Sequence, residues 1–76
     1  MSEASNQSEV ARIRRQIELE AEALALAMSG PAIMASHAAI DARYRNLGKA
    51  KEELASIVGE EEATDTMTDT YKRIIG

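Results

Sequence analysis

The chain has 76 residues, with 9 Lys and Arg against 13 Asp and Glu, so its net charge is −4. It contains no Cys, Trp or Phe, which excludes a disulfide scaffold, a zinc–cysteine site and a cysteine nucleophile. One hydrophobic core is barely sufficient at this length, so the composition favours an oligomer.

The first seven residues are small and polar and show no apolar periodicity. We predict a disordered tail over residues 1–7 and a single helical domain over residues 8–76. The chain start has neither the basic nor the apolar segment of a signal peptide, and no apolar run approaches the roughly 20 residues that span a bilayer. We therefore expect a cytoplasmic protein without a membrane partner.

A first helix is predicted over about residues 9–28, with Ser8 as its N-cap. Apolar side chains recur there at intervals of three or four residues, which places them on one side of a helix. This stripe consists of Val10, Ile13, Ile17, Ala21, Leu24 and Met28. Gly30 and Pro31 then form a helix stop signal.

A second helix is predicted over about residues 32–58, or from Ser36 at the latest. Its apolar positions alternate at spacings of four and three, the heptad pattern of a helix–helix seam. The seam consists of Ile33, His37, Ile40, Tyr44, Leu47, Lys51, Leu54 and Val58, of which His37 and Lys51 are polar. Gly59 breaks the pattern.

A third, short helix is predicted over about residues 60–75. Three glutamates, Glu60–Glu62, open it, where the helix dipole stabilises acidic groups. Its stripe consists of Ala63, Met67, Thr70, Tyr71 and Ile74. Threonine is a poor helix former, so this helix should require docking onto the other two. A strand over residues 64–71 is the competing interpretation, but no second strand is available to pair with it.

The predicted fold is all-α: an antiparallel hairpin of two long helices plus a short third helix, which together form a three-helix bundle. Folding at Gly30-Pro31 should bring acidic residues of the first helix toward basic residues of the second, and the reverse. The expected partners are Glu18 and Glu22 with Arg43 and Arg45, and Arg12 and Arg15 with Glu52 and Glu53.

The first helix carries a second apolar line formed by Leu19, Ala23 and Leu26. A helix that is apolar on all sides is usually buried. Two interpretations are open: the third helix covers this line within a monomer, or another subunit covers it. We favour the second, with a two-fold homodimer as the expected assembly and these three residues as its interface.

Few residues in the sequence indicate catalysis, metal binding or ligand binding. His37 is the only histidine, and it could pair with Asp41 one helical turn later. No triad partner is indicated for His37, so we predict no enzyme activity and no catalytic residue. The Glu-x-x-His motif of di-iron bundles is missing, so we predict no metal site and no cofactor. Met34, His37 and Asp41 form the candidate site for a small ligand or a metal in the alternative hypothesis.

The basic residues alternate with acids, and no aromatic residue accompanies them for base stacking. Nucleic-acid binding is therefore disfavoured, although it stays open as a third and weaker hypothesis.

The segments at residues 13–20 (IRRQIELE) and 54–63 (LASIVGEEEA) resemble short bacterial helical proteins of unassigned function. This resemblance concerns helix boundaries and implies no functional residue. The leading hypothesis is thus a non-enzymatic module for protein–protein interaction or oligomerisation, whose partner is a second copy or another protein.

Overall fold

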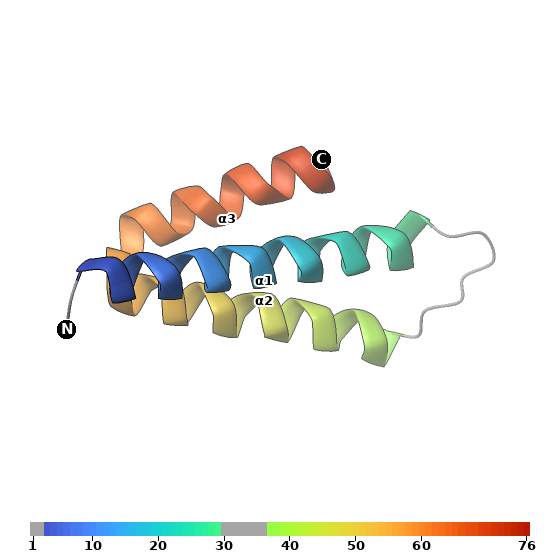
Figure 1. Ribbon diagram of the computed structural model, residues 1–76. Helices are drawn as coiled ribbons and strands as arrows, with labels where there is room; N and C mark the ends of the chain where they lie inside the picture. The colour runs from blue at the N-terminus through green and yellow to red at the C-terminus, as the bar shows by residue number, and fades with distance from the viewer. Residues whose placement is uncertain (1–2, 30–36) are drawn as a thin grey trace.

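Three helices follow one another in the computed structural model, which describes residues 3–29 and 37–76. They are α1 (Glu3–Ser29), α2 (His37–Val58) and α3 (Glu60–Ile74). No strand occurs in these two ranges. The bundle is elongated, 48 × 21 × 18 Å, with α1 and α2 side by side and α3 along one part of α1 (Figure 1). The predicted all-α three-helix fold is confirmed.

Helix α1 begins earlier than its apolar pattern indicated. The prediction of a disordered tail over residues 1–7 is wrong from Glu3 onward, because α1 is helical from that residue. Residues 3–8 lack Gly and Pro, and an acid at the first position suits the helix dipole. Asn6, Gln7 and Ser8 are exposed. Helical hydrogen bonding thus extends the helix through a segment that has no apolar stripe.

The glycine between α2 and α3 sets the start of the third helix. Gly59 has φ 98° and ψ 158°, a region that is essentially restricted to glycine. Acidic residues Glu60–Glu62 occupy the first turn of α3, and the basic residues Lys72 and Arg73 occupy its last turn, so both ends complement the helix dipole. The prediction of a helix over 60–75 agrees with α3 to within one residue.

The core is built from residues of all three helices. Its buried members are Ile13, Ile17, Leu24, Leu47, Ala50, Leu54 and Ala63. Ala21 is also buried, as is one polar residue, Thr70. The predicted α1 stripe is therefore confirmed except at its end, where Met28 is 45% exposed.

The predicted seam of α2 is only partly buried. Leu47 and Leu54 lie in the core, and Ile40, Lys51 and Val58 are half-buried. The seam fails toward its N-terminal end, where His37 is exposed and Tyr44 is 44% exposed. Ile33, the first predicted seam residue, lies outside the described residues, as do Met34 and the predicted helix start at residue 32.

At His37 the seam fails because α3 does not extend that far along the hairpin. Helix α1 has 27 residues and α3 has 15, so about 18 Å of α1 extends beyond the length of α3. Figure 1 shows α3 against the N-terminal part of α1, while α1 and α2 continue past its C-terminus as a pair. His37 belongs to this two-helix end, where no third helix packs.

Ion pairs between helices set the register, and they agree with the predicted pairing at one position. Arg12 Nη2 lies 3.0 Å from Glu53 Oε2, as expected for the antiparallel α1–α2 hairpin. On the same hairpin, however, Arg43 pairs with Glu20 at 3.1 Å rather than with Glu18. The reason is geometric, because Glu18 lies on the side of α1 that faces α3.

Candidate interaction surface

An apolar surface on the outer side of α1 is left uncovered by the bundle. We define this outer face by Leu19, Ala23 and Leu26, which the spacing of four and seven residues places on one side of the helix. Leu19 is 50% exposed and Leu26 is 74% exposed, while Ala23 is half-buried. The core residues Ile17 and Leu24 of the same helix have no exposed area. Helix α3 therefore does not cover Leu19 and Leu26, and the interpretation that it buries them within the monomer is wrong.

Charged side chains flank the outer face. Arg15 and Glu22 are seven residues apart, so they form a second row beside the row of Leu19 and Leu26. Both are exposed, and Arg15 Nη1 lies 3.3 Å from Glu18 Oε1. Glu22 makes no ion pair with any residue in the described ranges. The row is therefore basic toward the start of α1 and acidic toward its end.

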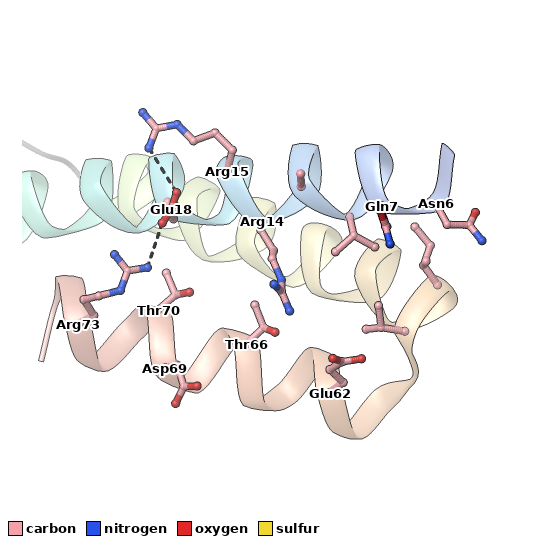
Figure 2. A pocket seen from close by; sticks show the side chains of 14 residues that line it. Asn6, Gln7, Arg14, Arg15, Glu18, Glu62, Thr66, Asp69, Thr70 and Arg73 are labelled. Carbon is pink, nitrogen blue, oxygen red and sulfur yellow. Dashed lines mark hydrogen bonds and ion pairs between the residues drawn. The ribbon is translucent and has the colours of Figure 1, made fainter. Parts of the chain in front are cut away.

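An open groove of about 1080 Å³ runs between α1 and α3 (Figure 2). It is lined by Asn6, Gln7, Val10, Ala11, Arg14, Arg15, Glu18, Ile57, Val58, Glu62, Thr66, Asp69, Thr70 and Arg73. The lining includes three arginines and three carboxylates, so the groove does not select ligands by net charge. The sequence patterns did not indicate this groove, because it depends on the angle between two helices that are far apart in the chain.

An ion pair between Glu18 of α1 and Arg73 of α3 lies in the lining of this groove. Arg73 Nη2 donates to Glu18 Oε2 at 3.0 Å, and Arg15 donates to the other oxygen of Glu18 (Figure 2). The hydrogen bond from Arg73, followed by that from Arg15, holds the pKa of Glu18 below its usual value of 4.5. This ion pair connects the last turn of α3 with the middle of α1.

Removing the Arg73 side chain should change the titration of Glu18. Because the pKa of Glu18 is lowered by folding, its ion pairs stabilise the protein above the unfolded-state pKa, and this contribution is lost as the pH falls through the folded-state pKa. We expect Arg73→Gln to raise the pKa of Glu18 and to weaken the acid dependence of stability. Carboxyl-carbon NMR titration measures this pKa, and Lys72→Gln is the matched control. An unchanged Glu18 pKa in Arg73→Gln contradicts the assignment.

Two of the three residues predicted to bind a ligand at the turn lie within the described chain. His37 and Asp41 are both exposed, and neither lines the groove. Met34 lies outside the described residues. In residues 3–29 and 37–76, no three His, Asp or Glu side chains are grouped so that they could hold a metal ion.

Among the described helices, none combines the length and the apolar character that crossing a membrane requires. Comparison of the chain with protein-family models, with curated proteins and with solved structures finds no match.

Proposed function

We propose that this protein is a non-enzymatic helical interaction module that forms a homodimer through Leu19, Ala23 and Leu26. The observation that carries the proposal is the exposure of two leucines on one side of a helix, 50% for Leu19 and 74% for Leu26. Burying a leucine side chain contributes roughly 1.5–3 kcal/mol, so a second molecule on this face gains free energy that the monomer cannot.

The position and composition of the face also support a partner. The outer face points away from the core, and α2 and α3 do not cover it. A half-buried alanine, Ala23, stands between the two leucines and permits close approach of another helix. A two-fold dimer is the simplest closed assembly in which one such face covers another.

The size of the face predicts a weak dimer. A helix of 27 residues is about 40 Å long and about 10–12 Å wide. A contact along its whole length therefore buries about 400–500 Å² per partner, below the roughly 800 Å² of a standard stable interface. We accordingly expect a dimer that dissociates on dilution.

Charging the outer face should abolish this dimer. In the double variant Leu19→Glu/Leu26→Glu, association loses the burial of four leucines per dimer and must desolvate four carboxylates. We expect the dimerisation affinity to fall by at least about 100-fold. Sedimentation velocity over a wide concentration series measures the affinity.

The matched control places the same charge on another exposed apolar residue. Ile57 is 37% exposed and lies at the end of α2, in the groove lining rather than on the outer face. Ile57→Glu should leave the dimerisation affinity unchanged, and circular dichroism confirms that each variant is folded. A wild-type protein that stays monomeric at all concentrations, or a folded double variant that dimerises as tightly as wild type, overturns the proposal.

A further inference from the structure

The chain has only two tyrosines and no Phe or Trp, and the fold brings these two tyrosines together. Tyr44 belongs to α2 and Tyr71 to α3, 27 residues later in the sequence. The hydrogen bond to Tyr71 raises the pKa of Tyr44 above its usual value of 10.0. The two phenol groups are therefore in contact across the junction of α2 and α3.

The helix register places both tyrosines on the facing sides of α2 and α3. Lys51 Nζ lies 3.7 Å from Glu60 Oε1, so these two residues mark the sides on which the helices meet. Tyr44 precedes Lys51 by seven residues, about two helical turns, and Tyr71 follows Glu60 by eleven residues, about three turns. Because α2 and α3 are antiparallel (Figure 1), both steps lead in the same direction along the bundle. The contact between the tyrosines thus agrees with the periodicity of both helices.

Both tyrosine rings are partly open to solvent. Tyr44 is 44% exposed and Tyr71 is 37% exposed, so an oxidant in solution reaches both. Phenols lose one electron readily, and the chain has no Cys or Trp that would be oxidised in their place. Methionine reacts differently, by the addition of an oxygen atom. A phenoxyl radical that forms on either tyrosine therefore has the other phenol beside it.

We infer that Tyr44 and Tyr71 form an oxidative cross-linking site, at which a one-electron oxidant driven by hydrogen peroxide joins the two rings within one molecule. Each phenol gives up one electron and its hydroxyl proton. The two radicals combine through the ring carbons next to the hydroxyl-bearing carbons, which forms one C–C bond. The hydrogens on the two joined carbons then move to the oxygens as the rings regain aromaticity. The protein thus loses two hydrogen atoms, and one peroxide is reduced to two waters.

The new bond ties the C-terminal part of α3 to α2. Four threonines give α3 a low intrinsic helix propensity, so this helix depends on docking. A covalent link between Tyr44 and Tyr71 closes a loop that contains Gly59, and it restricts the unfolded chain. We therefore expect the linked protein to unfold at a higher temperature. Neither tyrosine belongs to the outer face of α1, so the site is independent of the proposed homodimer.

The experiment treats the whole chain, at low concentration, with a haem peroxidase and hydrogen peroxide. Mass spectrometry should detect a monomer that is two hydrogens lighter, and a proteolytic digest should contain linked peptides with Tyr44 and Tyr71. The linked fraction at a fixed time should not change when the protein is diluted, because the reaction occurs within one molecule. Thermal melting of the linked product measures the expected gain in stability.

The variants test whether the α2–α3 contact places the two rings. Y44F and Y71F should each abolish the intramolecular product. The matched control Y71F/K72Y keeps a tyrosine at nearly the same distance along the chain but moves it to another side of α3, at an exposed position. We expect its intramolecular linking to be slower by at least about tenfold, because only the tethering of a flexible chain then brings the rings together. Circular dichroism confirms that each variant is folded.

Three outcomes overturn the inference. Linked product that forms only between molecules, at twice the mass of the chain, means that the rings do not meet within one copy. An unlinked protein in a reaction mixture that couples free tyrosine has the same meaning. If Y71F/K72Y forms the intramolecular link as fast as wild type, chain connectivity and not the contact between α2 and α3 brings the rings together.

Discussion

Replacing Leu54 by alanine is expected to lower the free energy of unfolding by about 2–5 kcal/mol. Leu54 has no exposed area and belongs to the core that joins the three helices. The substitution removes buried methyl groups and leaves a cavity among side chains that can relax only partly. A domain of this size has a total stability of about 4–11 kcal/mol, so the loss is a large fraction of the whole.

Leu26→Ala is the matched control for this prediction. The same atoms are removed, but Leu26 is 74% exposed, so the expected change is about 0.5 kcal/mol or less. Urea unfolding followed by circular dichroism measures both values, at a protein concentration low enough that dimerisation contributes nothing. An equal effect of the two substitutions is incompatible with the core as described.

Replacing Gly59 by alanine is expected to destabilise the protein by about 1–3 kcal/mol. Gly59 has φ 98°, where an L-residue is strained. No neighbouring atom lies within 4 Å of an added Cβ, so the cost arises from the backbone conformation alone. The chain has to keep this conformation because the Gly59 amide donates to Ala55 O at 2.9 Å while its carbonyl accepts from the Ala63 amide at 3.1 Å.

The same substitution at Gly48 should have the opposite sign. Gly48 lies inside α2, is exposed, and also has no atom within 4 Å of an added Cβ. Alanine is the better helix former there, so Gly48→Ala should stabilise the protein by about 0.5–1 kcal/mol. Thermal and urea unfolding of the two variants compare them directly. Destabilisation by Gly48→Ala, or a neutral Gly59→Ala, contradicts the helix boundaries given above.

Local signals in the sequence were sufficient to predict that the three helices exist. Gly59, followed by Glu60–Glu62, predicted the start of α3, because a glycine conformation and a helix dipole act on neighbouring residues only. The stripe that includes Ile13 and Ile17 likewise predicted the buried side of α1. The start of α1 at Glu3 was missed, since apolar periodicity reports packing and says little about a helical extension that packs on nothing.

The sequence predicted the position of the candidate interaction surface on α1 but not its exposure. The spacing of Leu19 and Leu26 placed them on one side of a helix, but it left open whether α3 would cover them. His37 fitted the heptad seam by spacing and is nevertheless exposed. Both outcomes depend on how far α3 extends along the hairpin and on which side of α1 it packs, and neither quantity is a property of the residues near Leu19 or His37.

The sequence by itself determined the all-α class, the ends of α3 and the buried stripe of α1, because caps, breakers and periodicity act within a few residues of one another. Only the tertiary structure decided which apolar residues stay exposed to solvent. Helix α3 packs against α1 through the shared core, with an ion pair between Glu18 and Arg73 beside it, and it is twelve residues shorter than α1. Leu19 and Leu26 stay exposed because α3 packs on a different side of α1, the side that carries Glu18.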